Sequence, residues 1–257
     1  MHIALIGSGN TATVLGRIIK QAGHTITGVY SKTLDHASSL AAELNAQHFG
    51  GIENITPNAE LYIVAVTDDM INEISAKIRL PEKIIVHTSG SAPKKALENI
   101  SQKYGVLYPL QSLRKEAKHQ PVIPFLIDGS DTLVTQQVKE LAESISSIVE
   151  EAGDDKRLKL HLAAVMVSNF TNHLYSLTEN FCAAENVPFK ALVPLIREVA
   201  ERTAQYHPSA MQTGPAIRGD GSTIEKHLQL LTAYPLQRDV YETITGSIRE
   251  FYDTNNK

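Results

Sequence analysis

Residues 2–12 read HIALIGSGNTA, an apolar run that leads into a glycine-rich turn and then into a stretch of helical character. Gly7 permits a tight turn, and Gly9 has no side chain to keep a pyrophosphate away from the main chain. Ala12 is small enough for a helix to lie close to the strand, and the N-terminus of that helix offers free N–H groups to phosphates. An ordinary turn between a strand and a helix is the alternative. The pattern favours a dinucleotide site made by the turn residues Gly7, Ser8, Gly9, Asn10 and Thr11.

The segments that follow alternate short apolar runs with amphipathic stretches, which is typical of an α/β fold with a doubly wound, mostly parallel sheet. Several of the runs are almost continuously apolar, as expected where helices cover both faces of the sheet. We expect helices over 11–22, 34–44 and 131–145, with Gly23 as the C-terminal cap of the first. The predicted strands are 2–6, 25–30, 61–66, 83–88, 105–108 and 122–127, with a last short one near 147–150.

The pattern changes at Asp155, after which the sequence predicts helices and no clear strand. A long helix capped by Asp154 or Asp155 carries apolar residues three and four apart, which predicts a stripe that faces a core. Ser222 and Glu225 have capping-box spacing for a later helix. These later helices are predicted over 189–205, 223–233 and 236–252. The apolar stripe consists of Leu158, Leu162, Val165, Met166, Phe170, Leu174 and Leu177. We therefore expect a Rossmann domain over 1–153 and an all-α domain over 154–257.

Composition excludes several classes of protein. The chain has 257 residues and a net charge of −4, which argues against a nucleic-acid backbone as the main partner. Its single cysteine, Cys182, permits no intrachain disulfide and is expected to be a small buried hydrophobe. No apolar run approaches the roughly 20 residues that span a bilayer, and a strand starting at His2 leaves no room for a cleaved signal peptide. We expect a cytoplasmic protein with no membrane partner and no metal site.

The end of the second predicted strand bears on the choice of cofactor. NAD enzymes usually carry an acidic residue there to bind the ribose hydroxyls, whereas a 2′-phosphate needs neutral or positive donors. The sequence at this point is Tyr30-Ser31-Lys32-Thr33, and no acid occurs before Asp35. Lys32 could instead be a solvated surface lysine. The pattern favours NADP over NAD, with Ser31 and Lys32 as phosphate-binding residues.

Later strand ends should line the same crevice, because ligands bind outside the carboxyl ends of parallel strands. Val66 and Thr67 follow one strand, and Thr88 and Ser89 follow the next. We expect these four residues to contact the cofactor. Other polar residues at these strand ends have simple structural explanations. Asp68 or Asp69 could cap a helix that starts near Met70, and His87 could be a core histidine with its hydrogen bonds satisfied. The proline of Tyr108-Pro109-Leu110 could simply turn the chain.

The C-terminal half contains a second polar group of residues. The segment 213–221 reads TGPAIRGDG. A simple connection between two helices would not require Arg218 and Asp220, which favours a functional role. An ordinary surface loop is the alternative. His227 is expected within about a turn of a helix N-terminus, where the dipole disfavours its cationic form. On the long helix, His161 and Asn169 lie along one face, and we favour Asn169 over His161 or His173 as a site residue.

These motifs resemble a Rossmann-like family whose C-terminal domain has no known function, and which is related to pyrroline-5-carboxylate reductases and deazaflavin-dependent NADP oxidoreductases. The resemblance covers nearly the whole chain. It is carried by the Gly7–Ala12 fingerprint, Thr88-Ser89-Gly90, Tyr108-Pro109-Leu110, the His161–Phe170 segment, Thr213-Gly214-Pro215, Arg218-Gly219-Asp220 and His227-Leu228.

The resemblance implies a β-hydroxyacid-dehydrogenase-like architecture, in which the helical domain often forms a homodimer. It implies NADP binding at Gly7, Gly9, Asn10 and Ser31. It also places Asn169, Thr213, Arg218 and His227 in a pocket that faces the nicotinamide. Related dehydrogenases carry a lysine four residues before the asparagine. Here that residue is Val165, which puts a lysine-based mechanism in doubt.

The leading hypothesis is an NADP-dependent oxidoreductase that transfers a hydride between the nicotinamide and a small polar substrate. An anionic substrate is one of the possibilities. Asn169 would orient the reacting carbonyl or imine, and Thr213 or His227 would donate or relay the proton. Arg218 would clamp a carboxylate, with Asp220 orienting Arg218 or His227. The second hypothesis, a non-catalytic dinucleotide-binding sensor, is favoured by the missing lysine. A deazaflavin or flavin partner ranks last, because the sequence offers no separate site for it.

Overall fold

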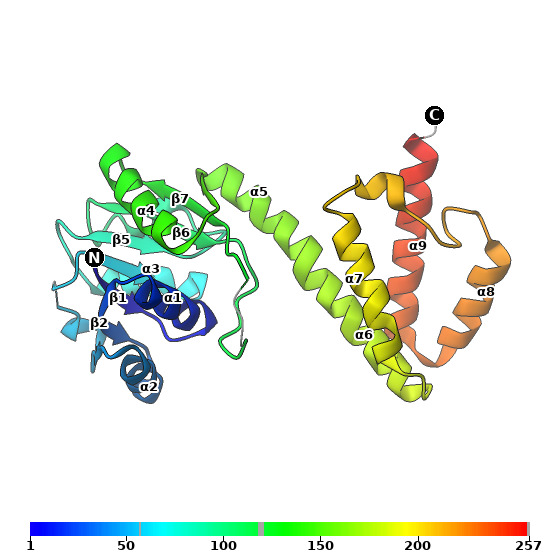
Figure 1. Cartoon of the computed structure of the whole chain (residues 1–257), viewed down its shortest axis with the longest axis horizontal. Helices are drawn as coiled ribbons and strands as arrows, with labels where there is room; N and C mark the ends of the chain where they lie inside the picture. Colours follow the sequence, from blue (N-terminus) through cyan, green and yellow to red (C-terminus); the bar gives the residue numbers. More distant parts are fainter. Residues whose placement is uncertain (57, 118–120, 256–257) are drawn as a thin grey trace. The chain divides into compact units, whose positions relative to one another are not determined.

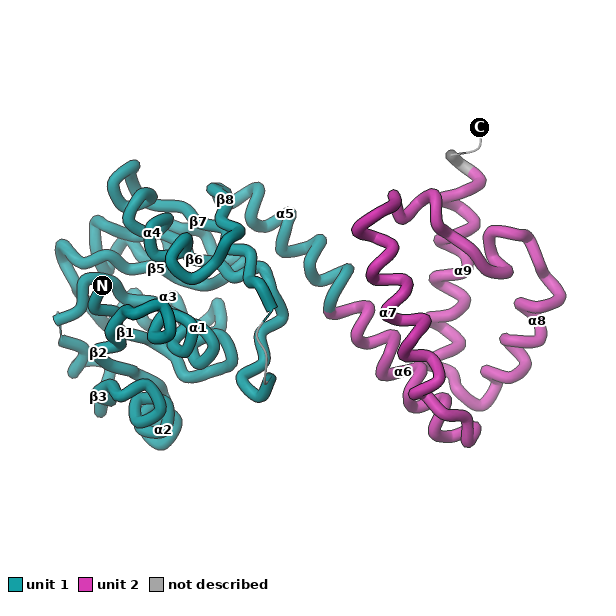
Figure 2. The backbone as a smooth tube through the Cα atoms, viewed as in Figure 1, with its two compact units in different colours: residues 1–168 teal, residues 169–257 magenta. Residues whose placement is uncertain are grey.

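The structure is a computed structural model that describes residues 1–56, 58–117 and 121–255. The chain divides into two compact units, residues 1–168 and 169–257 (Figure 2). Within the described residues, every strand belongs to unit 1, and unit 2 consists of helices and loops. The predicted fold class, a Rossmann-like sheet followed by a helical region, is confirmed. The boundary predicted after residue 153 remains a prediction about domains.

Unit 1 is built on a sheet whose eight described strands have the order β3-β2-β1-β4-β5-β6-β7-β8 (Figure 1). Neighbouring strands are parallel apart from β6 and β7, which are antiparallel. β3 was not predicted because its glutamine and histidine form no apolar run. The strands are β1 (His2–Ile6), β2 (Thr25–Tyr30), β3 (Gln47–His48), β4 (Leu61–Val64), β5 (Ile84–His87), β6 (Tyr104–Pro109), β7 (Phe125–Gly129) and β8 (Val149–Glu151).

Both faces of this sheet are covered, as the continuous apolar runs predict. Successive residues of a strand point to opposite faces, so Ile3 and Leu5 of β1 enter one core cluster while Ala4 and Ile6 enter another. The first cluster includes residues of three helices, and the second includes residues of α3. These helices are α1 (Asn10–Gln21), α2 (Leu34–Leu44), α4 (Thr132–Ile145) and α3 (Asp68–Lys77).

The strand order reverses at β1, which lies between β2 and β4. The chain builds β2 and β3 on one side of β1 and then β4, β5 and β6 on the other. In open parallel sheets such a reversal leaves a crevice outside the carboxyl ends of the strands, where ligands bind. The turn after β1 therefore lies at the position where this fold class holds its ligand.

The long predicted helix is present, although its regularity is interrupted. It consists of α5 (Asp154–Ala164), a π-helical segment (Val165–Phe170) and α6 (Thr171–Ala184). The N-cap of α5 is Gly153, so the prediction that an aspartate caps this helix is wrong. Asp154 and Asp155 lie in the first turn instead, where a negative charge interacts favourably with the helix dipole.

The prediction that the apolar stripe of this helix faces a core is wrong for its first half. Leu158, Leu162, Met166 and Phe170 are 50–60% exposed, whereas Leu177 is buried. The periodicity is real, but these four side chains are at least half exposed in the structure.

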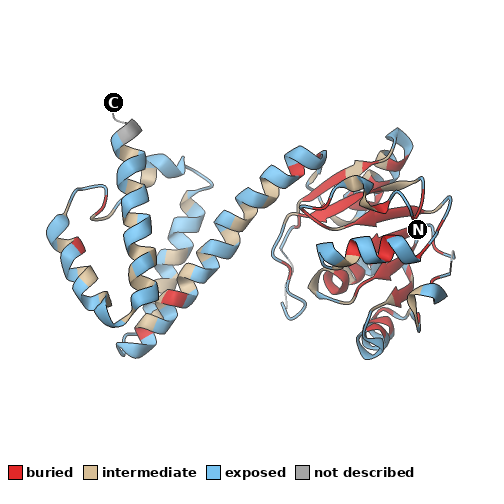
Figure 3. Ribbon diagram, turned by 180° about the vertical axis from the view of Figure 1, so that it is seen from behind, coloured by how far each residue is buried: buried red, intermediate tan, exposed pale blue. Residues whose placement is uncertain are grey.

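Unit 2 has little interior of its own, and Figure 3 shows its helices mostly exposed or half-buried. Its buried apolar residues are Leu177, Cys182, Ala216 and Ile224 among those described, which confirms the expectation for the cysteine. Its remaining helices are α7 (Val193–Arg202), α8 (Gly221–Leu230) and α9 (Pro235–Asn255). Within the described residues, no helix of either unit combines the length and apolar character needed to cross a bilayer.

The capping box predicted for α8 is wrong. Asp220 is the N-cap, and its carboxylate accepts a hydrogen bond from the Thr223 N–H at 3.1 Å. Ser222 lies in the first turn, and its hydroxyl donates to the same carboxylate at 3.1 Å. Aspartate is among the preferred N-cap residues, so the helix starts two residues earlier than predicted.

Candidate functional site

The turn between β1 and α1 uses its two glycines for different reasons. Gly7 has a φ of +131°, and a Cβ there would lie 2.1 Å from the carbonyl oxygen of Ala65. Only glycine fits at this position, so Gly7 is required by the fold. A Cβ on Gly9 would meet nothing within 4 Å. The protein does not need glycine at position 9 for its own packing, and the space beside it is open to a ligand.

The first turn of α1 is open to an anion. Gly9 is the N-cap, it offers no side-chain cap, and the first turn contains no acidic residue. Unpaired N–H groups and the positive end of the dipole therefore face the cavity. The start of the helix is tied to a distant segment, because the Lys115 N–H donates to Asn10 Oδ1 at 3.3 Å and Arg17 donates to the Lys115 carbonyl at 2.5 Å.

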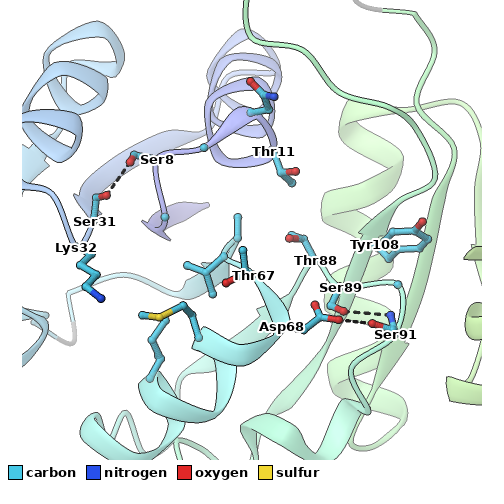
Figure 4. Close-up of a pocket in the computed structure, with 18 of the residues that line it drawn as sticks. Ser8, Thr11, Ser31, Lys32, Thr67, Asp68, Thr88, Ser89, Ser91 and Tyr108 are labelled. Atoms are coloured by element: carbon cyan, nitrogen blue, oxygen red, sulfur yellow. Dashed lines mark hydrogen bonds between the residues drawn. The ribbon is translucent and has the colours of Figure 1, made fainter. Parts of the chain in front are cut away.

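A cavity of about 550 Å³ lies against this turn, and all of its lining residues belong to unit 1 (Figure 4). Its volume lies within the range typical of sites for cofactors and small ligands. The structure brings together all the residues that the sequence predicted for the cofactor. They are Gly7, Ser8, Gly9, Asn10, Thr11, Ser31, Lys32, Val66, Thr67, Thr88 and Ser89.

One end of the cavity lies at the tip of β2. The Ser8 hydroxyl donates to the Ser31 hydroxyl at 2.7 Å, which links the glycine turn to this strand end. Lys32 lines the cavity beside Ser31, and its side chain is exposed. Asp35 is not among the lining residues. Among the described residues, this end of the cavity therefore has a positive charge and hydroxyl groups, and no carboxylate.

The ends of β4 and β5 meet at the other side of the cavity. The Ser91 hydroxyl donates to the Asp68 carboxylate, and the Ser89 hydroxyl accepts from the Ser91 N–H at 3.1 Å (Figure 4). The N-cap of α3 is Thr67, so the suggestion that Asp68 or Asp69 caps this helix is wrong. Asp68 instead joins the two strand ends.

His87 is a core histidine that cannot easily become charged. It is fully buried, and its Nδ1 accepts a hydrogen bond from the Ser89 N–H at 3.2 Å. Burial, and then the nearby Arg157 guanidinium, lower the pKa of His87 to about 4. The prediction of a core histidine is correct in placement, but the histidine is only half satisfied, because its Nε2 has no partner.

The cavity also contains a tyrosine–histidine pair that was not predicted as part of the site. Tyr108 at the end of β6 and His161 of α5 both line it, and the Tyr108 hydroxyl lies 2.9 Å from Nδ1 of His161. Their rings meet edge to face at 5.8 Å. A Cβ on Gly90 would lie 2.6 Å from Cγ of His161, so glycine at position 90 makes room for the imidazole. Burial raises the pKa of the Tyr108 phenol, which therefore stays protonated at neutral pH.

Comparison with known proteins assigns the chain to a family. A model described as NADP oxidoreductase, coenzyme F420-dependent, matches residues 2–91, and a domain of unknown function (DUF2520) matches residues 123–248. A solved structure from Bacteroides fragilis, assigned as an NADP oxidoreductase, shares 37% identity and a TM-score of 0.92, with 97% of this chain and 98% of that chain covered. The chain belongs to this NADP oxidoreductase family. The predicted resemblance is thereby confirmed.

More distant structures share the fold of this oxidoreductase family. An imine reductase from Myxococcus stipitatus in complex with NADP+ has 16% identity and a TM-score of 0.70, covering 99% of this chain and 95% of its own. A 1-pyrroline-5-carboxylate reductase from Streptococcus pyogenes has 12% identity and a TM-score of 0.63, with coverages of 97% and 98%. A comparison with curated protein sequences gave no match.

The four residues predicted to be catalytic all belong to unit 2 of this family member, and none lines the unit 1 cavity. Asn169 and Arg218 are exposed. Thr213 lines a second cavity of about 340 Å³, which is mostly apolar and lies within unit 2. His227 lies in the last turn of α8, so the predicted effect of a helix N-terminus is wrong. Their roles as site residues remain predictions.

The orienting role suggested for Asp220 is not observed. Its carboxylate accepts hydrogen bonds from Thr223 and Ser222 in capping α8. Nδ1 of His227 lies 2.8 Å from the Tyr241 hydroxyl instead. Asp220 therefore has a structural role that accounts for its place in the sequence.

Proposed function

We propose that the protein is an NADP-dependent oxidoreductase that transfers a hydride between the nicotinamide and a small polar substrate. The observation that carries the proposal is Gly9, whose missing side chain leaves open space at the uncapped N-terminus of α1. A diphosphate there would accept hydrogen bonds from main-chain N–H groups and interact with the helix dipole. Membership of an oxidoreductase family supports the same conclusion.

The preference for NADP over NAD rests on the end of β2. Lys32 and Ser31 line the cavity there, and no carboxylate of the residues that the structure describes lines this end to accept hydrogen bonds from ribose hydroxyls. A cationic side chain and a hydroxyl suit a 2′-phosphate, because charge-assisted hydrogen bonds to phosphate are the strong ones. When bound, the nicotinamide supplies or accepts the hydride, while the protein's residues bind, orient and exclude water.

Fluorescence titration with NADPH and NADH tests this function. Wild-type protein should bind NADPH at least about tenfold more tightly than NADH, which corresponds to about 1.4 kcal/mol. Lys32→Ala should remove most of this preference and leave NADH binding unchanged. Gly9→Ala should weaken the binding of both cofactors by about tenfold or more without lowering the melting temperature, because its Cβ occupies only open space.

Gly246→Ala in α9 is the matched control for Gly9→Ala. A Cβ there also meets nothing within 4 Å, and alanine is about 1 kcal/mol better than glycine inside a helix. This variant should bind NADPH as wild type does. Wild-type protein that bound neither nucleotide would refute the cofactor. Bound NADPH with no consumption across a panel of imines, 2-keto acids and short aldehydes would favour the sensor hypothesis instead.

We also propose that the protein forms a homodimer through unit 2. Several large apolar side chains of this unit are more than half exposed, including Leu195, Leu230 and Leu236. Exposed apolar surface of this extent commonly marks a protein interface. Light scattering should give twice the chain mass of 28.2 kDa, and Leu230→Arg should reduce it. A wild-type protein that is monomeric at micromolar concentration would contradict the proposal.

A further inference from the structure

The side of the cavity away from Lys32 contains the groups best suited to proton transfer. Figure 4 shows Tyr108 across the pocket from Ser31 and Lys32, beside the Thr88 and Ser89 strand end. His161 lines the same cavity and shares a hydrogen bond with Tyr108. If Lys32 binds the phosphate of the adenosine half of the cofactor, the reactive half extends toward this pair.

We propose that His161 donates the proton that accompanies hydride transfer in reduction, and that Tyr108 is the residue that positions its ring. This inference rests on the proposed function, because it names the acid for that reaction. It assigns to His161 the role that the sequence gave to Thr213 or His227.

The surroundings of the imidazole determine which nitrogen can act. Nδ1 is held by the Tyr108 hydroxyl at 2.9 Å, and the ring packs on Gly90, which leaves it room. Within the described residues, Nε2 of His161 has no hydrogen bond to the protein. A histidine fixed at Nδ1 by a partner presents Nε2 for proton transfer, which is the usual division of roles between the two nitrogens.

The reaction balances with one hydride and one proton. The substrate carbon gains the hydride that the reduced cofactor supplies, and the electron pair of the C=N or C=O double bond moves to the heteroatom. The heteroatom bonds to the proton that leaves Nε2 of the His161 imidazolium, whose ring becomes neutral. Solvent returns the proton to the ring before the next turnover.

The titratable groups around His161 come from four elements. Tyr108 of β6 contacts it, and Asp68 at the start of α3 lines the same cavity. Arg157, one turn earlier on α5, is 1% exposed and pairs with Asp154 at 2.8 Å. His87 of β5 stays neutral near pH 7, because its pKa is about 4. Burial raises the pKa of the Tyr108 phenol, so this group also keeps its proton at neutral pH.

A second histidine outside the cavity provides the control variant. With a substrate found in the panel above, His161→Asn should lower kcat by about 100-fold or more, the usual size of general acid catalysis, with KM changed less than about threefold. His48→Asn, at an exposed position of β3 that does not line the cavity, should keep kcat within about threefold. Wild-type kcat should fall as pH rises, because the imidazolium is the donor. This dependence should vanish in His161→Asn and persist in Tyr108→Phe, whose kcat falls less.

A second readout does not depend on a substrate. ¹⁵N-histidine NMR spectra of the NADP+ complex assign the His161 ring by the signal that disappears in His161→Asn. This ring should gain one proton as the pH is lowered from about 9 to about 5. A ring that stays neutral over this range overturns the proposal, as does a normal kcat in His161→Asn. A titrating ring supports it even when no panel member is reduced. Failure of wild-type protein to bind NADPH would instead sink the proposed function.

Discussion

Two histidine–tyrosine pairs in this molecule have nearly the same geometry and different surroundings. Nδ1 of His161 lies 2.9 Å from the Tyr108 hydroxyl, with the rings 5.8 Å apart. Nδ1 of His227 lies 2.8 Å from the Tyr241 hydroxyl, with the rings 5.6 Å apart. The first pair lines the cavity that also contains the glycine turn and several hydroxyl groups, whereas Tyr241 lines a more apolar one.

The difference teaches that such a hydrogen bond does not by itself identify a functional histidine. A buried or half-buried imidazole needs a partner wherever it lies, so the bond satisfies a structural demand in both units. What separates His161 is the open space beside it and the uncapped helix of α1 on the same cavity. The following variants test whether the surroundings decide the role.

The largest expected effect is on the pH dependence of stability and concerns His87. This third histidine extends the comparison because it is fully buried and does not line the cavity. Its folded pKa of about 4 lies below the usual value of 6.5, so the unfolded chain binds a proton that the folded chain does not. Its contribution to stability is therefore lost as pH falls from about 6.5 toward 4, by roughly 3 kcal/mol at the lower end. Urea unfolding of wild type and His87→Gln across this range should show a steeper loss in wild type, and equal slopes would contradict it.

Gly90→Ala tests the space that the first pair needs. The new Cβ would meet Cγ and Nδ1 of His161 at 2.6 and 2.7 Å, so the imidazole must move away from Tyr108. We expect kcat to fall by about 30-fold, since a displacement of about 1 Å can cost up to 100-fold. NADPH affinity should change less than about threefold by titration. An unchanged kcat would show that the placement of the ring is unimportant.

Removing each tyrosine hydroxyl gives the smallest expected effects and the most direct comparison. Tyr108→Phe should lower kcat by about tenfold, because the ring of His161 loses the bond that orients it. Tyr241→Phe should leave kcat unchanged and cost about 1 kcal/mol of stability, the net worth of a typical hydrogen bond. Steady-state kinetics and thermal unfolding of both variants measure this. Equal losses of kcat in the two variants would show that the two pairs do not differ in their functional role.

Local pattern was enough to predict the fold and to predict that the glycine turn and the strand ends meet, which they do at one cavity. The β1 turn and α1 are contiguous in the sequence, and the other strand ends follow from the rule that parallel strands share one edge. The second cluster was harder, because Tyr108 and His161 are 53 residues apart and meet only after the sheet has formed. The available signals were that Tyr108 ends a strand at that edge and that His161 lies on the same helix face as Asn169.

The errors in the helical half have a common physical cause. Apolar periodicity in α5 and the π-helical segment indicated a face that would be buried. Periodicity does not say which segment packs against such a face, and Leu162 is 60% exposed. The start of α8 was misplaced because Asp220 and Ser222 are both good N-cap residues. His227 was consequently assigned to the wrong end of its helix.

The hydrogen bonds between α1 and Lys115 allow limited proteolysis to report whether the cavity is occupied. The amide and the carbonyl of this exposed lysine are both held, by Asn10 and Arg17. Trypsin must pull a peptide out as an extended strand before cutting it, so cleavage after Lys115 requires both contacts to break. Because Asn10 also lines the cavity, a bound dinucleotide that steadies it should slow this cut, and the digestion pattern would report occupancy without any chemical turnover.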